Sequence, residues 1–149
     1  MHKQDLQNRV ALFVDTCKNC NLKVTPQRIS IYRELVKSKN HPSTDGMYQV
    51  VRKEFPNISF DTVHRTLLTF SEIGVVDVVE GFGGSKRFDP DVTDHHHLHC
   101  MVCGGITDFI HEEYNNLNIP EEIQERFTVV GKRVVLKGIC KKCKYKPKK

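Results

Sequence analysis

The sequence predicts an α+β protein built from two small domains. Three observations support this: the first 73 residues contain four amphipathic helical stretches, two β-rich runs flank a glycine-rich turn between residues 75 and 89, and short β-like runs follow Pro90. A chain of 149 residues is long enough for one ordinary domain or for two small ones. We expect one domain over residues 1–88 and a second over 89–149.

The first two helices follow from the spacing of apolar residues. Residues 3–16 repeat apolar side chains at helical spacing: Leu6, Val10, Phe13 and Val14. A second helix starts after Thr25, which is a favoured N-cap residue, and Pro26 occupies the first helical position. Its apolar stripe consists of Ile29, Tyr32 and Val36.

Two further helices have clear start and stop signals. The third opens at Ser43 or Thr44 and is stopped by Pro56, with an apolar face of Met47, Val50, Val51 and Phe55. The fourth opens at Ser59 or Asp61 and ends before Gly74, with an apolar face of Val63, Leu67 and Phe70.

The runs "VVDVVE" and "SKRFD" flank the turn "GFGG" and predict a β-hairpin. Helices followed by a hairpin, with a polar and basic face on the last helix, are typical of a winged helix-turn-helix. Such a fold places its last helix in the DNA major groove. The alternative is a small helical domain with an edge hairpin and no role in DNA binding.

The second domain combines three β-like runs, "HLHCMV", "ITDFI" and "FTVVGKRVVLKGIC", with one helix from Pro120 through about Phe127. A domain this short can bury only a small apolar core by itself. We therefore expect it to be completed by dimerisation.

The net charge of +5 is unevenly distributed. Residues 1–88 carry 13 basic against 9 acidic side chains, residues 89–140 carry 4 against 9, and the last nine residues hold six lysines. A basic first domain favours a polyanionic partner, whereas the lysine tail is typical of a solvated end. No apolar run approaches the roughly 18 residues of a membrane span and the N-terminus lacks a signal-peptide pattern, so we expect a cytoplasmic protein with no membrane partner.

All six cysteines occur in C-x-x-C pairs. In a reducing compartment such pairs favour metal binding or redox chemistry over structural disulfides. The pairs Cys100/Cys103 and Cys140/Cys143 predict a closed tetrahedral zinc site of four thiolates, and the alternative is disulfides or free thiols. Cys17 and Cys20 form a redox pair, a partial metal site or two half-buried thiols, of which we favour the last.

Four histidines lie between residues 95 and 99. In a strand His95, His97 and His99 share one face and His96 points to the other. We expect His95 and His97 to be a pair of metal ligands, although a single histidine here would more often be a solvated surface residue. Composition does not identify the remaining ligands.

The motifs "LKVTPQR", "HPSTDGMY", "SFDTVHRTL", "RFD", "HHHLHCMVCG", "ITDF" and "GICKKC" occur in the order found in the ferric uptake regulator family, which the chain resembles over nearly its whole length. The resemblance implies a metal-dependent transcription repressor that binds a double-stranded DNA operator as a homodimer. It also implies an N-terminal winged helix, a C-terminal dimerisation domain and one structural Zn(II) per subunit.

The resemblance supplies the missing ligands of a regulatory site for Fe(II) or Mn(II). Carried over position by position they are His41, Asp89 in the interdomain linker, His95, His97 and Asp108. Iron-sensing members generally have Glu where this chain has Asp89 and Asp108, and peroxide-sensing members resemble it in having Asp. In those members peroxide oxidises a ligand histidine at the bound Fe(II), and the candidates here are His41 and His95.

The chain departs from the family at three places, the first being the pair Cys17/Cys20, which lies outside the family's zinc pattern. Many members have a third metal site, but the matching positions here are Asp94, His96, Asn115 and Lys132, and a protonated lysine cannot ligate a metal. We therefore expect His96 and His99 to be surface residues. On the expected recognition helix His64 replaces the usual Tyr, and the DNA-contact candidates are Lys23, Ser59, Thr62, His64 and Arg65.

Three functions are compatible with these features. The leading hypothesis is a repressor that senses hydrogen peroxide through Fe(II). The first alternative is an iron, manganese or zinc uptake regulator without oxidation chemistry. The second is a metalloenzyme, since histidine and carboxylate ligands also suit hydrolytic or oxygen chemistry. No general-base or nucleophile motif accompanies the ligands, so we expect no enzyme.

Overall fold

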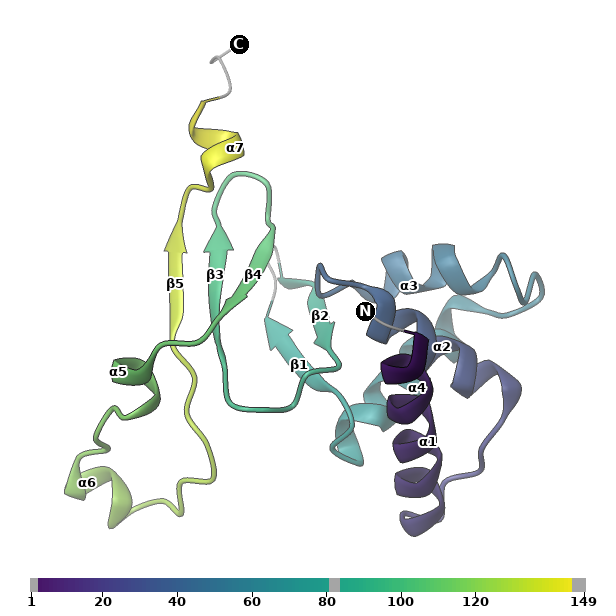
Figure 1. The fold of residues 1–149 in the computed structure, drawn as a ribbon, viewed down its shortest axis with the longest axis horizontal. Coiled ribbons are helices and arrows are strands. Elements are labelled where there is room, and N and C mark those ends of the chain that lie inside the picture. The colour runs from purple at the N-terminus through teal and green to yellow at the C-terminus, as the bar shows by residue number, and fades with distance from the viewer. Residues whose placement is uncertain (1–2, 81–83, 146–149) are drawn as a thin grey trace. The chain divides into compact units, whose positions relative to one another are not determined.

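The computed structural model describes residues 3–80 and 84–145, and they form two compact units (Figure 1). The first unit extends to Val92 and the second begins at Thr93. The boundary therefore lies four residues beyond the expected one. The reason is that Asp89 belongs to a hairpin strand of the first unit, where it pairs with Asp77.

The first unit begins with four helices, α1 (Lys3–Asn19), α2 (Pro26–Lys37), α3 (Thr44–Val51) and α4 (Phe60–Glu72). The last three have side-chain N-caps, at Thr25, Ser43 and Ser59. Each hydroxyl accepts a hydrogen bond from the backbone N–H three residues later, at 3.2, 3.2 and 3.0 Å. The N-caps decide between the alternatives at the third and fourth helices in favour of Ser43 and Ser59.

Two helix ends differ from the expected ones. Helix α1 runs to Asn19 rather than to residue 16. It is closed by Asn21, whose φ of 54° lies in the left-handed region, and by a bond of 2.8 Å from the Leu22 amide to the Cys17 carbonyl. Helix α3 ends at Val51 instead of reaching Pro56, because the Lys53 and Glu54 amides bond to carbonyls only three residues earlier and tighten the last turn.

Three aromatic rings from three helices form the centre of this unit's core. The Phe13 ring stacks on Tyr32 with centroids 4.2 Å apart and meets Phe70 edge-on at 4.9 Å. Aliphatic residues from α2, α3 and α4 surround them: Ile31, Leu35, Val36, Met47, Val51, Val63 and Leu67. The apolar stripes expected from the sequence therefore form one core.

A β-hairpin completes the first unit. Strands β1 (Asp77–Glu80) and β2 (Lys86–Asp89) pair antiparallel, with Val79 opposite Arg87. The glycine turn expected between them falls largely on residues 81–83, which lie outside the described residues. Helices followed by a hairpin give the winged-helix arrangement that the sequence predicts.

The second unit is built on a sheet of three strands in the order β4–β3–β5. Strand β3 (His96–Cys100) pairs antiparallel with β4 (Ile106–Phe109) and parallel with β5 (Val135–Gly138). Three one-turn helices, α5 (Glu112–Asn115), α6 (Glu121–Gln124) and α7 (Lys141–Lys144), complete it. The expected helix over 120–127 is only four residues long, and the long run from Phe127 forms a strand only where β3 supplies a partner.

The second unit buries few apolar side chains. Among its described residues only Cys100 and Ile106 are buried hydrophobics, whereas four histidines are buried: His95, His96, His97 and His99. No described helix is long and apolar enough to cross a membrane. A unit with so small an apolar core needs other sources of stability.

Candidate metal centres

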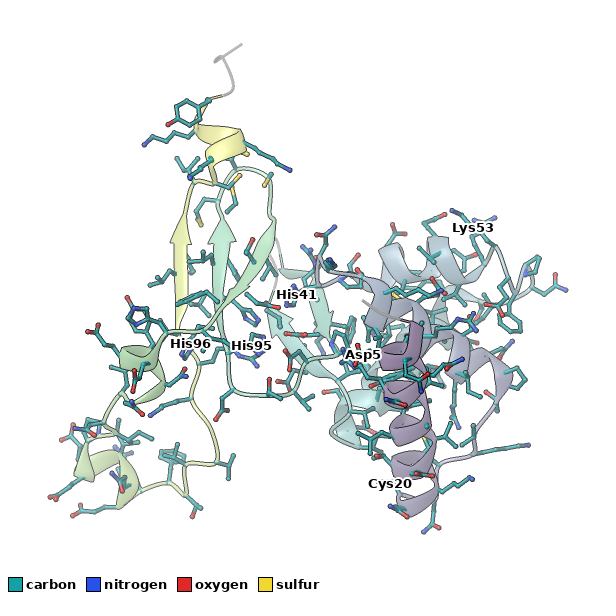
Figure 2. The ribbon with its side chains drawn as sticks, viewed as in Figure 1. Asp5, Cys20, His41, Lys53, His95 and His96 are labelled. Carbon is teal, nitrogen blue, oxygen red and sulfur yellow. The ribbon has the colours of Figure 1, made fainter. Side chains whose placement is uncertain are left out.

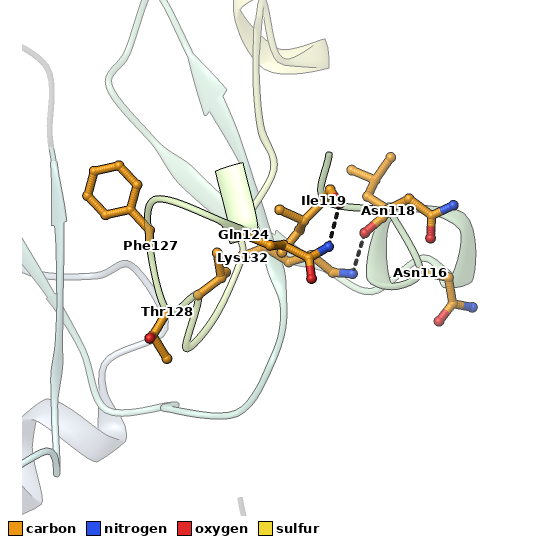
Figure 3. Close-up of a pocket in the computed structure, with 9 residues that line it drawn as sticks. Asn116, Asn118, Ile119, Gln124, Phe127, Thr128 and Lys132 are labelled. Atoms are coloured by element: carbon orange, nitrogen blue, oxygen red, sulfur yellow. Dashed lines mark hydrogen bonds between the residues drawn. The ribbon is translucent and has the colours of Figure 1, made fainter. Parts of the chain in front are cut away.

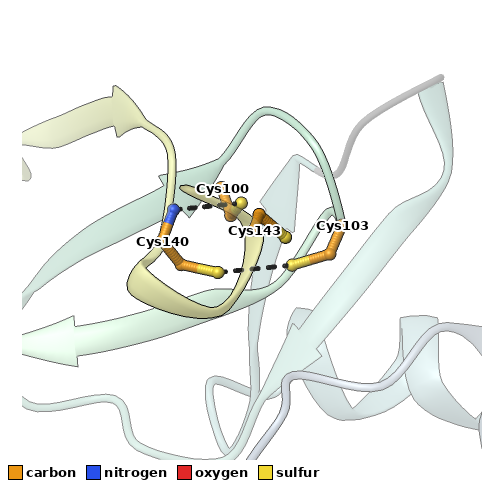
Figure 4. Close-up of side chains that lie close together, drawn as sticks. All are labelled: Cys100, Cys103, Cys140 and Cys143. Carbon is orange, nitrogen blue, oxygen red and sulfur yellow. Dashed lines mark hydrogen bonds between the residues drawn. The ribbon is translucent and has the colours of Figure 1, made fainter. Parts of the chain in front are cut away.

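Four cysteines converge at one end of the second unit's sheet (Figure 4). Cys100 is the last residue of β3, and Cys103 follows in a turn closed by Gly104 at a φ of 69°. Cys140 caps α7 and Cys143 lies within it. Parallel pairing of Cys100 with Gly138 brings the two C-x-x-C segments together.

The spacing of the four sulfurs fits a zinc ion. All four lie within 4.8 Å of one another, and the Sγ atoms of Cys103 and Cys140 are 4.0 Å apart. A tetrahedron with Zn–S bonds of about 2.3 Å separates its sulfurs by about 3.8 Å, whereas a disulfide joins them at about 2.05 Å. The cluster therefore fits the expected zinc cage and not a pair of disulfides.

The thiol pKa values show why the cage needs a cation. Backbone amides, of which the Cys140 N–H donates to the Cys100 Sγ at 3.3 Å, lower the pKa of Cys100 to about 6. A hydrogen bond with the Cys140 thiol, followed by burial and the other cysteines, raises the pKa of Cys143 to about 12. The Cys143 thiol thus resists ionising at neutral pH beside the Cys100 thiolate, and a bound divalent cation removes that obstacle.

A second group of donors lies in the first unit. The Nε2 atom of His41, in the loop before α3, is 3.0 Å from the Oδ2 atom of Asp89 at the end of β2, and both side chains are buried. His41 has a φ of 46°, a left-handed conformation that costs a non-glycine residue of order 1–3 kcal/mol. The residue before a proline is restricted further, and Pro42 follows. This histidine therefore sits where it does because the surrounding structure holds it there.

A third group lies in the second unit. The Nε2 atoms of His95 and His97 are 2.9 Å apart, and the Asp108 Oδ1 atom is 3.6 Å from the first and 3.4 Å from the second. His97 and Asp108 are cross-strand partners in the β3–β4 register. The His95 Nδ1 lies 2.8 Å from the Thr93 carbonyl, to which it donates, so its Nε2 carries the lone pair that a metal requires.

Both groups have the spacing of neighbouring metal ligands. Donors about 2.1 Å from a metal and at right angles to one another lie about 3.0 Å apart. The His41–Asp89 pair at 3.0 Å and the His95–His97 pair at 2.9 Å match this value. Imidazole and carboxylate donors suit Fe(II) or Mn(II) better than a thiolate cage does.

His96 is not the surface residue expected from the sequence. Its side chain is buried, and its ring packs against Phe109 with centroids 5.4 Å apart. The Val134 amide donates to its Nδ1 at 3.1 Å, so its Nε2 donates to the Asn115 Oδ1 at 2.7 Å. His99 is also buried, which contradicts the same expectation. Both residues were misjudged because the histidines replace apolar residues in this unit's core.

An open pocket beside this region is lined by no histidine, cysteine or carboxylate side chain (Figure 3). Its only charged lining residue is Lys132, whose Nζ donates to the Leu117 carbonyl at 2.7 Å. Gln124 donates in the same way to the Ile119 carbonyl at 2.7 Å. Lys132, one of the four positions that match the family's third metal site, is thus bonded to a backbone carbonyl.

The first cysteine pair divides between core and surface. Cys17 is fully buried and Cys20 is exposed at the C-terminal end of α1, so the pair is not two half-buried thiols (Figure 2). Both thiols are free, and burial raises the pKa of Cys17. Cys17 lies within α1 and belongs to the hydrophobic core, whereas Cys20 follows the last residue of that helix, and this separates their exposure.

Four of the five candidates for DNA contact lie in α4 or at its N-cap. Ser59 and Thr62 form its N-cap, and their hydroxyls are 2.8 Å apart. Arg65 is exposed and bonds to Asp61 at 2.8 Å. Lys23, outside the helix, is also exposed.

His64 on the same helix is held by two neighbours that the sequence did not reveal. Its Nδ1 lies 3.0 Å from the Thr44 hydroxyl, and its ring is nearly parallel to the half-exposed Phe60 ring, with centroids 6.3 Å apart. One edge of the imidazole is therefore occupied within the protein, which leaves the Nε2 edge for a partner.

Two arginines that no sequence motif indicated contact the backbone of His41 and of His95. Arg87 in β2 donates from Nε to the His41 carbonyl and from Nη2 to the Asn40 carbonyl at 2.5 Å. In the second unit the Arg133 Nε donates to the His95 carbonyl at 3.2 Å. Burial lowers the pKa of Arg87. No local pattern could have revealed these contacts, since each joins residues about 40 positions apart.

Comparison with known proteins gives consistent matches over the chain. Residues 19–137 match the model of the ferric uptake regulator family. A peroxide-responsive repressor, PerR, of Staphylococcus aureus is 32% identical over 143 residues, which cover 96% of this chain and 97% of the relative.

Solved structures match as well. The Campylobacter jejuni peroxide stress regulator has a TM-score of 0.65 at 30% identity, covering 87% of this chain and 98% of that one. The ferric uptake regulator of Helicobacter pylori has a TM-score of 0.78 at 22% identity over 96% of both chains, which shows the shared fold. A zinc-bound manganese uptake regulator has a TM-score of 0.63 at 28% identity, covering 85% of this chain and 96% of that one.

Proposed function

This chain belongs to the ferric uptake regulator family, and from that premise we propose that it is a homodimeric, DNA-binding transcriptional repressor that responds to hydrogen peroxide through bound Fe(II). Members of the family are metal-dependent regulators rather than enzymes. We place its action in the cytoplasm, where its operator DNA is found.

The observation that carries the proposal is the matched spacing of two donor groups, one in each unit. The first unit offers His41 and Asp89, and the second offers His95, His97 and Asp108. We propose that one Fe(II) or Mn(II) ion is bound by all five donors. Because the ligands then come from both units, the metal stabilises one arrangement of the units by its differential affinity for it.

That arrangement would set the distance between the two α4 helices of a dimer. A helix-turn-helix dimer binds half-sites about one helical turn apart, so its affinity depends on this distance. Ser59, Thr62, His64 and Arg65 of α4 would face the major groove, and Lys23 would lie near the backbone. Loss of the metal would release the units and the DNA.

The two aspartates favour peroxide sensing over plain metal sensing. Peroxide-sensing members have Asp at both carboxylate positions, as this chain has at Asp89 and Asp108. Fe(II) held by these residues would supply the redox chemistry through which hydrogen peroxide oxidises a ligand imidazole by two electrons. One peroxide oxygen would be added to the ring and the other would leave as water. His41 and His95 are the candidates. The oxidised ring is a poorer ligand, which lowers metal affinity and ends repression.

The second candidate function is an iron, manganese or zinc uptake regulator without oxidation chemistry. The similarity to a manganese uptake regulator at 28% identity favours it, and so does the donor set, which accepts Mn(II) as readily as Fe(II). The two candidates differ only in what peroxide does to the iron form.

One experiment separates them. DNA selected from a random library by the Mn(II)-loaded chain is titrated with the Fe(II) and the Mn(II) forms, each before and after peroxide. We expect peroxide to abolish DNA binding by the Fe(II) form alone, and to add 16 Da to the peptide holding His41 or His95. If the Fe(II) form still binds DNA after peroxide and its peptide masses are unchanged, the result rejects peroxide sensing and favours the uptake regulator.

A matched variant sharpens the test. In the Asp89→Glu/Asp108→Glu chain each carboxylate is lengthened by one methylene, and we expect metal-dependent DNA binding to be retained because the donor atoms stay the same. We expect this variant to lose most of its histidine oxidation, measured by the same peptide masses. Equal oxidation in both chains would show that the aspartates do not confer peroxide sensing.

A further inference from the structure

The loop that carries His41 is held in a conformation that the chain would not adopt by itself. His41 has a φ of 46° and precedes Pro42, so both its own side chain and the following ring disfavour its conformation. A released loop would relax toward negative φ. That relaxation would carry the imidazole away from Asp89.

Strand β2 supplies the contacts that oppose this relaxation. The Phe88 amide donates to the Pro42 carbonyl at 3.0 Å, and the backbones of Arg87 and Ser43 form an isolated antiparallel β-bridge. The half-buried guanidinium of Arg87 also reaches back along the loop, where its Nε donates to the His41 carbonyl and its Nη2 to the Asn40 carbonyl. One side chain thus holds two consecutive carbonyls on either side of the strained φ and ψ angles.

The same strand carries the second donor. Asp89 lies two residues beyond Arg87 in β2, and its carboxylate faces the His41 Nε2 at 3.0 Å. The strand that bears one ligand therefore also holds the backbone of the other.

We propose that Arg87 is a positioning residue for the regulatory metal, which holds His41 in its left-handed conformation so that the two ligands of the first unit are already spaced for metal binding. This inference rests on the proposed function. It predicts that the planar two-pronged shape of the guanidinium favours metal binding and that its charge does not, since a cation near a metal site by itself opposes metal binding.

The test is the Mn(II) affinity of the full-length, zinc-loaded chain, measured from the EPR signal of free Mn(II). Arg87→Lys keeps the charge and loses the fork, and Arg87→Ala loses both. We expect both to weaken Mn(II) binding by about tenfold, which corresponds to about 1.4 kcal/mol. Arg52→Lys at the end of α3 is the matched control and should stay within about twofold of the wild type.

The alternative role for Arg87 is purely electrostatic. It predicts wild-type affinity for Arg87→Lys and tighter binding for Arg87→Ala, and either result overturns the proposal. A wild-type chain that binds Mn(II) no more tightly than Asp108→Ala would instead overturn the proposed function, and the inference with it.

A second measurement distinguishes positioning from general stabilisation. In the zinc-loaded, Mn(II)-free chain the ring ¹⁵N signals of His41, assigned from their loss in His41→Asn, should report one tautomer. In Arg87→Lys we expect the His41 ring shifts to move toward the average of the two tautomers, while the ring shifts of His96 stay unchanged. Unchanged His41 signals, or equal changes at both histidines, would contradict the proposal.

If Arg87→Lys does not keep the zinc content and melting midpoint of the wild type, chemical rescue of Arg87→Ala tests the proposal instead. We expect millimolar methylguanidinium, but not methylammonium at the same ionic strength, to restore Mn(II) affinity to Arg87→Ala. Rescue by neither ion, or by both equally, would reject a role for the guanidinium fork.

Discussion

A single hydroxyl, that of Ser59, has a structural role and a proposed functional one. It caps α4 by accepting the Thr62 amide at 3.0 Å, and it lies on the helix end that we propose enters the major groove. Loss of DNA binding in Ser59→Ala alone would therefore be ambiguous, because removing an N-cap costs a helix about 1 kcal/mol.

Replacement by aspartate separates the two roles. Aspartate is as good an N-cap as serine and suits the positive end of the helix, so Ser59→Asp should keep the melting midpoint that Ser59→Ala lowers. A carboxylate facing DNA phosphates should weaken binding by at least about tenfold, through repulsion that added salt reduces. Thermal denaturation and DNA titration at two salt concentrations measure both effects. Wild-type DNA affinity in Ser59→Asp would place this position away from the phosphate backbone.

At the scale of elements, the second unit depends on the tie between β3 and β5. The two strands pair in parallel from His97 to Cys100, and the cysteine cage closes that pairing at one end. With only two buried hydrophobic residues among those described, this unit obtains little stability from apolar burial. Zinc binding contributes about 10–16 kcal/mol in small structural sites, and so it can supply most of what folding requires.

Removal of one cage ligand should therefore unfold the second unit and spare the first. In Cys143→Ser we expect zinc content to fall below one per chain and the β3 and β5 amides to lose hydrogen-exchange protection, while the amides of α2 and α4 keep theirs. Cys20→Ser is the matched control, because its thiol is exposed and distant in sequence from the cage. Protection of β3 that survives zinc loss would mean that the sheet is stable by itself.

At the scale of the whole molecule, the exposed face of β5 points to a second copy of the chain. Strand β5 is an edge of the three-stranded sheet and all four of its residues are exposed, including Val135 and Leu136. The neighbouring Val130 and Ile139 are exposed as well, at 98% and 59%. An uncovered apolar edge strand is a template for pairing with another chain, which agrees with the proposed homodimer.

A charge on this edge should disrupt the dimer. We expect Leu136→Lys to shift the sedimentation equilibrium mass from two chains toward one at micromolar concentration, and to weaken operator binding with it. Lys137→Ala, on the same strand, changes a residue that is already polar and should leave the dimer intact. A Leu136→Lys chain that stays dimeric would exclude β5 from the interface.

The sequence by itself determined the elements of the first unit and the chemistry of the zinc cage. Apolar spacing and N-cap residues are local signals, so α2, α3 and α4 begin where Thr25, Ser43 and Ser59 indicate. Two C-x-x-C pairs identify a tetrahedral site because each pair supplies its ligands within one turn. Alternation along a strand indicated His95 and His97 as a ligand pair, whereas His41, Asp89 and Asp108 came from family resemblance.

Tertiary structure alone decided the features that depend on contacts between distant segments. The His41 carbonyl accepts a hydrogen bond from an arginine 46 residues away, and the buried His96 ring is satisfied by Asn115 and by the amide of Val134. Nothing in the sequence distinguishes Cys17 from Cys20, and their exposure differs because Cys17 belongs to the hydrophobic core. Strand β5 is shorter than its β-like run because pairing with β3, not propensity, fixes its ends. A local pattern specifies what a segment can form, and only its distant neighbours decide which polar groups are satisfied and which side chains are buried.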